Sequence, residues 1–330
     1  MHCKKIKLIL FLLNLLIWGS FSSIWAENSI KNKLVVFHAG SLSVPFKMIE
    51  ENFEKSYVNI DILRESSGSR LAARKVSELN RQADIVAVSD YDVILDILMP
   101  KYTDWYLCFA CNQMVIMYDK HSKYAQIINS SNWPKILLKK GVDYGYSDPN
   151  LDPCGYRSLF VWQLAEKYYQ IPGLYEKLSQ NCPSKNIRPK ETDLIALVEA
   201  GELDYIFNYR SVATQHNFPF IELPDAINLS TSKFKDYYKK ASMKVSGKKP
   251  GTYSKVRGTP IFYALTIPKN AKNKKAAYKF IEYLLSEEGR GILVNCGQPP
   301  IVPATINKLK HLPSELNSLL IKGLIEIKKN

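Results

Sequence analysis

Short apolar runs alternate with segments of helical periodicity from residue 33 onward. Apolar runs of strand length at 34–37, 58–63 and 84–88 predict strands. Between them, apolar positions at helical spacing predict helices over 46–53 and 71–79. This order of strands and helices predicts a parallel sheet covered by helices. Ligands of such sheets bind beyond the carboxyl ends of the strands, so the strand-to-helix turns are the first candidates for a site.

A second α/β block follows the first. Its predicted elements and those that close the fold are strands at 113–118, 142–146, 205–209, 220–223 and 261–267, and helices at 133–138, 155–169, 194–199, 274–285 and 287–294. Because 330 residues exceed the usual size of one hydrophobic core, we expect two lobes with a cleft between them. The predicted boundaries place 27–112 and 261–330 in the first lobe and 113–260 in the second.

The first residues have the pattern of an export signal. Lysines at positions 4, 5 and 7 form a short basic start, a mainly apolar run covers 6–18, and small and polar residues follow up to Ala26. This pattern predicts a signal peptide over residues 1–26, cleaved after Ala26, and the alternative is an uncleaved N-terminal anchor. No later run approaches the roughly 20 apolar residues that a spanning helix needs. We therefore expect a soluble, exported mature chain.

The chain is basic, with 45 Lys and Arg against 31 Asp and Glu. Cleavage after Ala26 would lower the formal net charge from +14 to +11 by removing three lysines. Such a charge suits nucleic acid, an anionic membrane surface, an anionic small ligand or solubility alone. Nine Lys and Arg against one Asp lie in 232–258, where we expect a solvated loop or hairpin. Few aromatic residues interrupt them, so nucleic-acid binding is not favoured.

Five cysteines remain beyond the predicted cleavage point, so they cannot all pair. Cys108 and Cys111 have the spacing of a zinc ribbon, but no second pair of ligands at similar spacing exists. The segment around them predicts an apolar strand whose thiols are either buried or joined in a disulfide. We expect no metal site there.

Two strand-to-helix turns of the first lobe carry serine and glycine. The sequence His38-Ala-Gly-Ser-Leu follows the first predicted strand, and Glu65-Ser-Ser-Gly-Ser follows the second. Backbone N–H groups and hydroxyls at helix starts can donate to an anion, and the helix dipole favours negative charge there. Each serine could instead be an ordinary helix cap. Because successive strand ends converge, we expect Ser41 and Ser69 to face one anion.

Three further candidates lie in the second lobe. Asp152 stands in a proline-rich turn before a long predicted helix, where a capping role is the alternative. Glu191 also precedes a helix, where an acid in the first turn is stabilised by the dipole. Tyr209 ends a predicted strand. All three lie at ends of elements that would border the cleft.

Six segments carry a family resemblance: FHAGSL, SSGS, ADIVAVSDY, DPCGYRSL, ETDLIALVEAGELDYIFNYRSVA and IFYALTIPKNA. They resemble the WtpA-type tungstate/molybdate-binding proteins, relatives of the bacterial ModA-type molybdate-binding proteins, and the similarity runs from about residue 34 to 303. The resemblance implies a type II periplasmic-binding-protein-like fold: two α/β lobes, each a mostly parallel sheet flanked by helices, that close over one oxyanion. It also implies a periplasmic, extracytoplasmic receptor that serves the membrane permease of an ABC importer.

The resemblance assigns roles to the five candidates. Ser41 and Ser69 become hydroxyl donors to the oxyanion, and Tyr209 becomes a ligand from the second lobe. Asp152 and Glu191 become carboxylates that reach the metal atom of the oxyanion, expanding its four oxygen neighbours toward six. We expect tungstate or molybdate as the ligand, no cofactor, no nucleic-acid partner and a monomer.

The two carboxylates also discriminate between oxyanions on physical grounds. Like charges in a closed cleft repel, so a receptor for a simple anion should not place Asp152 and Glu191 against it. Tungsten and molybdenum centres are hard Lewis acids that accept oxygen ligands, whereas sulfur and phosphorus in their oxyanions do not. The pair therefore favours tungstate or molybdate over sulfate, without ranking tungstate against molybdate.

Two other functions stay open from the residues alone. A thiol enzyme would use Cys154 as nucleophile and one of His38, His121, His216 or His311 as base. A receptor for sulfate, phosphate or iron would keep the two-lobed fold with another ligand. We expect a binding protein and no enzyme.

Overall fold

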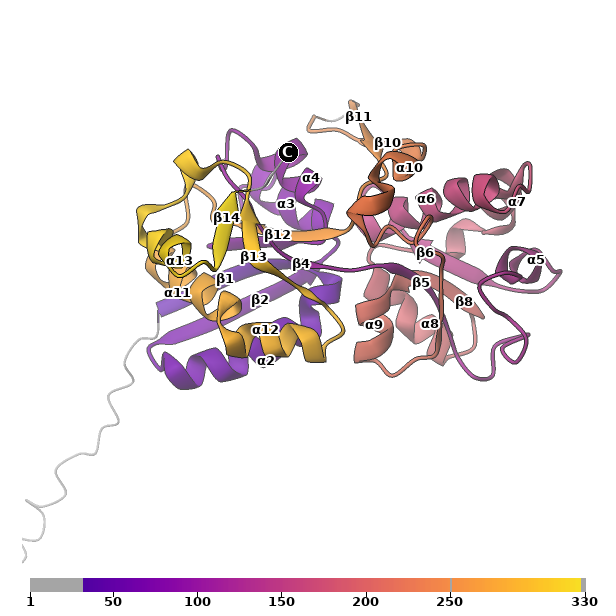
Figure 1. Ribbon diagram of the computed structural model, residues 1–330, viewed down its shortest axis with the longest axis horizontal. Helices are drawn as coiled ribbons and strands as arrows, with labels where there is room; N and C mark the ends of the chain where they lie inside the picture. The colour runs from indigo at the N-terminus through magenta and orange to yellow at the C-terminus, as the bar shows by residue number, and fades with distance from the viewer. Residues whose placement is uncertain (1–31, 250, 328–330) are drawn as a thin grey trace, which may run out of the picture. The chain divides into compact units, whose positions relative to one another are not determined.

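The computed structural model describes residues 32–249 and 251–327, and the predicted signal peptide lies outside them. The described chain forms two mixed sheets flanked by helices and a separate two-stranded hairpin (Figure 1). The larger sheet has seven strands in the order β14-β13-β4-β12-β3-β1-β2, and the smaller has five in the order β7-β6-β8-β5-β9. Among the described helices, none is long and apolar enough to span a bilayer.

The first three strands confirm the predicted parallel unit. The elements are β1 (Asn32–Ala39), α2 (Ser43–Ser56), β2 (Ile60–Ser67), α3 (Ser69–Ser77) and β3 (Ile85–Val88). Strand β1 pairs in parallel with β2 on one side and β3 on the other. The predicted apolar face of α2 is buried, and its Phe46 and Phe53 both contact the ring of Phe280 at centroid distances of 5.5 and 6.0 Å. This packing holds the turn after β1 in place.

Aromatic rings pack between the five-stranded sheet and helix α6 (Pro153–Tyr168). Its strands are β5 (Met114–Tyr118), β6 (Tyr144–Ser147), β7 (Ile187–Arg188), β8 (Tyr205–Tyr209) and β9 (Phe220–Glu222). Its helices are α5 (Trp133–Leu137), α6 (Pro153–Tyr168), α7 (Leu174–Asn181), α8 (Ile195–Glu199) and α9 (Arg210–Gln215). Trp162 of α6 contacts Tyr146 and Phe207 at centroid distances of 5.2 and 5.4 Å. Helix α6 is buried from Pro153 through most of the residues up to Ala165, which fixes its N-terminal end next to Asp152.

The predicted α/β fold, with sheets flanked by helices, is confirmed, and both sheets are mixed because each contains antiparallel strands beside its parallel ones. Strand β12 (Phe262–Thr266) is antiparallel to both β3 and β4 (Leu107–Cys111), and β5 is antiparallel to both β8 and β9. A parallel pair needs a crossover connection, usually through a helix. Strands β5 and β12 instead enter their sheets from segments that cross between the sheets, so the connection does not impose a parallel direction. The helix-connected strands are the parallel ones.

The chain passes between the sheets twice. Strand β4 belongs to the seven-stranded sheet and β5 to the five-stranded sheet, with only Asn112 and Gln113 between them. The chain returns to the larger sheet at β12, after the hairpin. Figure 1 shows β4 and β12 running side by side at this junction.

The C-terminal part completes the seven-stranded sheet. Helices α11 (Lys274–Leu285) and α12 (Glu287–Asn295) confirm the prediction, whereas β13 (Pro300–Ile306), α13 (Asn317–Ile321) and β14 (Ile325–Ile327) were not predicted. The remaining short elements are η1 (Gly40–Leu42), α4 (Tyr91–Val93), η2 (Ile94–Leu98), η3 (Ser184–Asn186), η4 (Glu191–Leu194), η5 (Ser232–Phe234), α10 (Lys235–Tyr238), η6 (Leu309–His311) and η7 (Ser314–Leu316). Prolines at both 300 and 303 hide the strand pattern of β13.

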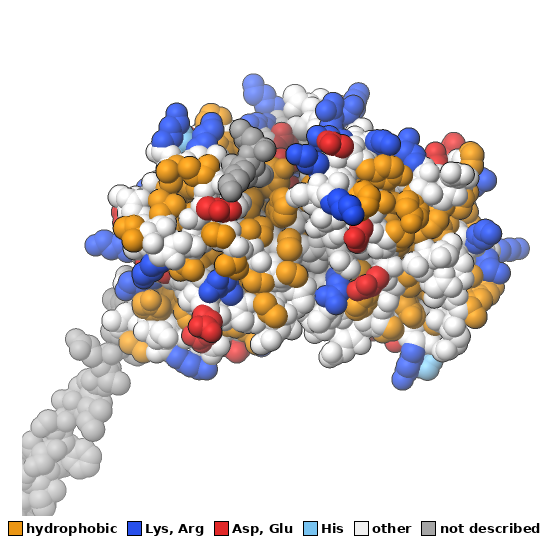
Figure 2. Space-filling model, in the orientation of Figure 1, with side chains coloured by type: hydrophobic (Ala, Val, Ile, Leu, Met, Phe, Trp, Pro, Cys, Tyr) orange, Lys and Arg blue, Asp and Glu red, His pale blue; other side chains and the backbone are white. Residues whose placement is uncertain are grey.

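The basic segment contains the expected hairpin, formed by β10 (Ser242–Ser246) and β11 (Tyr253–Arg257). Lys and Arg side chains gather over this part of the molecule (Figure 2). The carbonyl of Ser246 accepts hydrogen bonds from Arg70 and Arg74 of α3, at 2.6 and 2.9 Å. Ser254 donates to Asp96 at 2.9 Å. The hairpin therefore attaches to helices that flank the larger sheet.

The two cysteines of β4 are thiols. Cys108 is buried, and the partly buried Cys111 donates to the carbonyl of Pro299 at 3.4 Å. Of the two alternatives left open by the sequence, the buried strand with reduced cysteines is correct. Within 32–249 and 251–327, no group of three or more His, Cys, Asp and Glu side chains could hold a metal ion.

Candidate functional site

The five predicted residues come together between the two sheets, and each is at most 1% exposed. The backbone N–H of Ser41 donates to Oε1 of Glu191 at 2.5 Å. The backbone N–H of Glu191 donates to Oδ2 of Asp152 at 2.9 Å. On the other side, the hydroxyl of Tyr209 donates to Ser89, whose hydroxyl lies 3.1 Å from that of Ser69. The structure thus joins residues from four separate turns and one strand end.

The turn after β1 brings the backbone close to Glu191. Gly40 and Ser41 begin the short helix η1, directly beyond the last residue of β1. A Cβ atom at Gly40 would lie 2.7 Å from Oε2 of Glu191, closer than side chains tolerate. Glycine is therefore required here for the carboxylate to reach the backbone N–H of Ser41.

The turn after β2 meets the loop that carries Asp152. The backbone N–H groups of Arg70 and Leu71, in the first turn of α3, donate to the carbonyl of Leu151 at 3.0 and 3.2 Å. A Cβ atom at Gly68 would lie 2.5 Å from the same carbonyl oxygen. Donors at the start of α3 are thus satisfied by a loop of the other sheet, so the two sides of the site are in contact.

Ser41 and Ser69 are not helix caps. The residue at the N-cap of α3 is Gly68, and the starts of η1 and α2 likewise have no side-chain cap. Ser69 instead accepts a hydrogen bond from the backbone N–H of Ser89 at 3.0 Å. Ser89 directly follows β3, so it is the third strand end at this edge of the sheet. The sequence analysis missed Ser89, although its position after the third predicted strand was a usable signal.

Asp152 does cap helix α6. Its Oδ1 accepts from the backbone N–H of Cys154 at 3.1 Å, while Oδ2 accepts from Glu191. Glu191 is the first residue of η4, as expected for an acid in a first helical turn. Its Oε2 is buried and has no hydrogen-bond partner in the described structure. This oxygen therefore requires either a proton on the carboxyl pair or a bound ligand to satisfy it.

Burial changes the ionisation of both carboxyl groups. It raises the pKa of Asp152, and it raises that of Glu191 well above its ordinary range, with the nearby Asp152 charge adding to the effect. Two ionised carboxylates in this position would repel each other without a compensating positive centre. The two carboxyl groups therefore favour sharing one proton between them, or binding a Lewis acid in the place of that proton.

A buried arginine that the sequence analysis did not single out connects the two sheets. Nη1 of Arg157 donates to the carbonyl of Ser89 at 2.7 Å and to the hydroxyl of Tyr209 at 2.8 Å. Its Nη2 lies 3.0 Å from Oδ2 of Asp90, an ion pair without hydrogen-bond alignment. Tyr156 also donates to Asp90, at 2.5 Å. The signal for Arg157 was a charged residue inside the predicted long helix.

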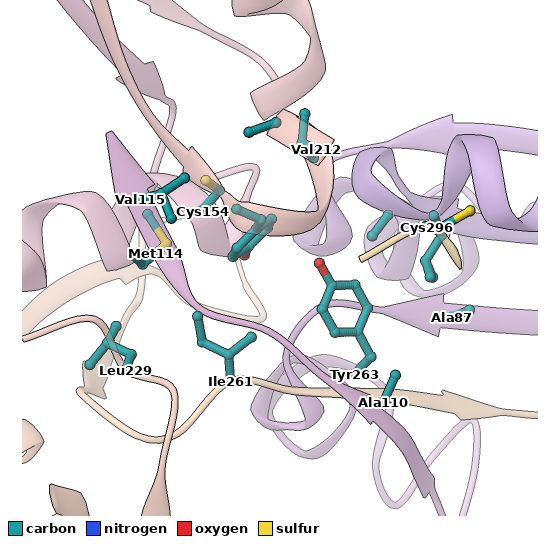
Figure 3. Close-up of a cluster of buried hydrophobic side chains, with 14 of the residues drawn as sticks. Ala87, Ala110, Met114, Val115, Cys154, Val212, Leu229, Ile261, Tyr263 and Cys296 are labelled. Carbon is teal, nitrogen blue, oxygen red and sulfur yellow. The ribbon is translucent and has the colours of Figure 1, made fainter. Parts of the chain in front are cut away.

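A second tyrosine, Tyr263, lies within hydrogen-bond distance of the Ser41 hydroxyl. The hydroxyls of Ser41 and Tyr263 lie 2.7 Å apart, and Nδ2 of Asn112 donates to Tyr263 at 3.1 Å. Figure 3 shows Tyr263 at the junction of the two sheets, with its hydroxyl pointing away from its own strand. Neither Asn112 nor Tyr263 was a candidate from the sequence.

The thiol-enzyme alternative finds no support in the geometry. Cys154 is fully buried, its Sγ donates to the carbonyl of Phe207 at 3.7 Å, and burial holds its pKa well above the ordinary range. A protonated, enclosed thiol is a poor nucleophile. His38 hydrogen-bonds with the carbonyl of Ala39 at 2.8 Å rather than with a thiol.

A basic cavity lies beside the site. It has a volume of about 600 Å³, and its lining includes Arg70, Asp96, Tyr156, Lys255 and Arg257. The five predicted site residues do not line it. The cavity instead lies among β11 of the hairpin, α3, α4 and η2 of the larger sheet, and Tyr156 of α6.

Comparison with known proteins assigns the chain to a class. Residues 34–297 match the bacterial extracellular solute-binding proteins, and the chain belongs to that family. The fold is that of the type II periplasmic binding proteins, with mixed α/β sheets flanked by helices.

Three individual proteins illustrate the similarity. An uncharacterised solute-binding protein of Petrotoga mobilis is 53% identical over 303 residues, covering 92% of this chain and 94% of that protein. The molybdate/tungstate-binding protein WtpA of Pyrococcus abyssi is 42% identical over 324 residues, covering 90% and 91%. The solved periplasmic molybdate-binding protein of Azotobacter vinelandii has a TM-score of 0.57 at 16% identity, covering 80% of this chain and 98% of that one. At such low identity, the last comparison supports the fold alone.

Proposed function

We propose that this protein is the extracytoplasmic receptor of an ABC importer and that it captures tungstate or molybdate. The family supports the role of a solute receptor, and the 42% identical WtpA protein supports the ligand. In this proposal the ligand binds between two lobes, formed by 27–112 with 261–330 and by 113–260. Ser41, Ser69 and Tyr209 donate to the oxyanion, while Asp152 and Glu191 approach its metal atom.

One observation carries the proposal: Oε2 of Glu191 is a buried carboxylate oxygen without an aligned donor, and it lies beside the turn that carries Gly40 and Ser41. Oε2 of Glu191 has no hydrogen bond, although the side chain is 1% exposed. Leaving a buried carboxylate oxygen unpaired is costly unless a ligand compensates for it. A tungsten or molybdenum centre accepts such an oxygen as a ligand, and the donor groups nearby hold the oxygens of the oxyanion.

Each side of the site has a distinct chemical task. Hydroxyl and backbone donors satisfy the ligand's oxygens, which can only accept hydrogen bonds when the oxyanion is fully ionised. Arg157 adds a buried positive charge beside Tyr209 and offsets the accumulated negative charge. Asp152 and Glu191 add oxygen ligands to the metal atom. Sulfate offers no atom to receive these carboxylates, so for sulfate the same pair is repulsive.

The location of the ligand groups on two sheets favours closure around the ligand. Tungstate or molybdate would bridge Ser41 and Ser69 on one side with Asp152, Glu191 and Tyr209 on the other, and so stabilise the closed arrangement. The closed receptor, a monomer in the periplasm, would then deliver the ligand to the membrane permease.

Competition calorimetry tests the proposed function. Purified protein lacking residues 1–26 is titrated with tungstate, molybdate, sulfate and phosphate, each alone and then in displacement of another. We expect tungstate and molybdate to bind far more tightly than the other two and to displace each other. Equal or tighter binding of sulfate or phosphate would overturn the proposed ligand.

A further inference from the structure

We infer that Tyr263 and Asn112 are positioning residues that direct the hydroxyl proton of Ser41 toward the bound oxyanion. The inference rests on the proposed function and adds two residues to its site. It follows from the direction in which each hydrogen bond of the chain Asn112–Tyr263–Ser41 must run.

The first bond has a fixed direction. Oδ1 of Asn112 accepts from the backbone N–H groups of Gln113 at 2.9 Å and Ser211 at 3.4 Å, which identifies the other amide atom as Nδ2. Nδ2 lies 2.7 Å from the hydroxyl of Ser211 and 3.1 Å from that of Tyr263. An amide nitrogen only donates, so the Tyr263 oxygen is the acceptor.

The second bond follows from the first. Having accepted from Asn112, the buried phenol of Tyr263 needs an acceptor for its own proton, and the hydroxyl of Ser41 lies 2.7 Å away. Ser41 then accepts from Tyr263, and its own proton points to a further acceptor, which is the Glu191 carboxyl beside it when no ligand is bound. Burial raises the pKa of Tyr263, so the phenol keeps the proton that this bond requires.

The same logic applies to the other two hydroxyls of the proposed site. Ser69 accepts from the backbone N–H of Ser89, and Tyr209 accepts from Nη1 of Arg157. Each hydroxyl therefore has a nitrogen donor behind it, and its own proton goes to an acceptor; that of Tyr209 goes to the hydroxyl of Ser89, 3.3 Å away. A fully ionised oxyanion is such an acceptor, and it has no proton to offer in return. Ser41 differs in that its nitrogen donor acts through Tyr263.

The hydrogen-bond chain Asn112–Tyr263–Ser41 lies where the protein chain crosses between the two sheets. Asn112 stands between β4 and β5, and Tyr263 lies in β12, so they belong to the two segments that cross between the sheets. Ser41 belongs to the turn after β1. Their hydrogen bonds connect the two crossing segments to a proposed ligand group. Orientation of Ser41 then depends on the relative position of these segments.

The test is a double-mutant cycle on tungstate affinity, measured by calorimetry with Tyr263→Phe, Ser41→Ala and the double variant. Tyr263→Phe keeps the ring and removes only the hydroxyl. We expect it to weaken binding roughly tenfold, the effect of about one hydrogen bond. In the Ser41→Ala background the same change should have almost no further effect, because Tyr263 acts through Ser41. Tyr102→Phe is the matched control, since it removes a 2.7 Å hydrogen bond to Ser77 away from the site.

The outcomes separate the two proposals. Failure of the unaltered protein to bind tungstate overturns the proposed function. If the unaltered protein binds tungstate, an equal affinity of Tyr263→Phe overturns the inferred role of Tyr263. An equal loss of affinity on Tyr263→Phe with Ser41 present and in the Ser41→Ala variant overturns it as well. Thermal unfolding shows whether Tyr263→Phe is folded. If it is not, Asn112→Ala takes its place in the cycle, with the same expected non-additivity and the same contradictory results.

Discussion

The backbone N–H of Ser41 donates to the Glu191 carboxylate at 2.5 Å across 150 residues of sequence. Ser41 stands in the turn after the first strand of the larger sheet, and Glu191 follows β7 of the smaller sheet. A single contact thus joins the turn after β1 of one sheet to a carboxylate of the other. In the proposed function, the same two residues would therefore affect both the closure of the site and its choice of ligand.

The charge of Glu191 should affect tungstate and sulfate in opposite directions. Glu191→Gln keeps the size of the side chain and removes its charge. Tungstate should bind about ten to a hundred times more weakly, because a strong oxygen ligand is lost, a cost of about 1.5–3 kcal/mol by analogy with charged hydrogen bonds. Sulfate should bind more tightly at a pH high enough to ionise Glu191, whose pKa burial raises, because a repulsive charge is lost. Calorimetry with both anions measures the two changes.

Glu222→Gln is the matched control for this experiment. Glu222 is exposed, pairs with Arg210 in the same part of the chain and lies outside the proposed site. It should leave both affinities unchanged. A change of the same sign for tungstate and sulfate in Glu191→Gln would show that Glu191 acts only on folding or closure.

The parts of the site that follow parallel strands were predictable from the sequence. Ser41 and Ser69 lie at successive strand ends, and such ends converge by the geometry of a parallel sheet. Ser89 obeys the same rule, so it could have been included. Asp152 and Glu191 were recognised as residues before helices, but their mutual contact depends on how β6 and β7 pair. The family resemblance, rather than the pattern, connected them to one ligand.

The rest of the site could not be predicted because it depends on long-range packing. Asn112 and Tyr263 lie on segments that cross between the sheets, and no local periodicity marks them as neighbours of Ser41. Arg157 lies in a buried helix, where its position shows only that it needs a partner. The antiparallel strands were missed for a related reason: pairing direction depends on which sheet a strand enters, and the hydrophobic pattern does not contain that information.

His38 should make the stability of the folded protein sensitive to mild acid. Burial lowers the pKa of His38 from 6.5 to about 4 in the folded protein. Between these values the unfolded chain binds a proton that the folded protein excludes, so stability rises with pH through this range. The free energy of unfolding should therefore fall as the pH drops from about 6.5 to 4, by about 3 kcal/mol from this group alone. Urea unfolding at several pH values measures it.

His38→Gln should remove that part of the acid sensitivity, whereas His121→Gln, at an exposed position, should retain it. Other groups titrate in the same range, so the informative quantity is the difference between each variant and the unaltered protein. Identical pH profiles for His38→Gln and the unaltered protein would contradict the assignment of a neutral, buried imidazole.

The contact between α3 and the hairpin should slow ligand release. Arg74 donates to the carbonyls of Ser246 and Gly247 at 2.9 and 3.2 Å, and to that of Asn150 at 3.2 Å. Arg74→Ala removes these bonds between the two sides of the site. We expect release of tungstate to become about three to ten times faster, since each bond contributes about 0.5–1.5 kcal/mol at most. Stopped-flow tryptophan fluorescence measures the rate.

Arg81→Ala is the control for the hairpin experiment, because Arg81 pairs with Glu65 of the neighbouring strand and makes no described contact with the hairpin. Its release rate should match that of the unaltered protein. An unchanged release rate in Arg74→Ala would mean that the hairpin contact does not contribute to the closed state.

Alkylation should separate a receptor from a thiol enzyme. Cys111 is only partly buried, whereas Cys154 is enclosed and its pKa is raised far above the ordinary range. Iodoacetamide under native conditions should therefore modify Cys111 before Cys154. Tungstate affinity should be unchanged after this modification. Rapid labelling of Cys154, located by mass spectrometry of peptides, would show that the thiol is accessible and would reopen the catalytic alternative.

X-ray absorption at the tungsten edge measures directly whether Asp152 and Glu191 bind the metal atom of the oxyanion, without relying on affinity. The account predicts about six oxygen neighbours around tungsten in the unaltered protein, two of them from the carboxylates. The Asp152→Ala, Glu191→Ala double variant, saturated with tungstate, should retain only the four oxygens of the free oxyanion. Four oxygen neighbours in the unaltered protein, with equally tight binding by the double variant, would contradict the account.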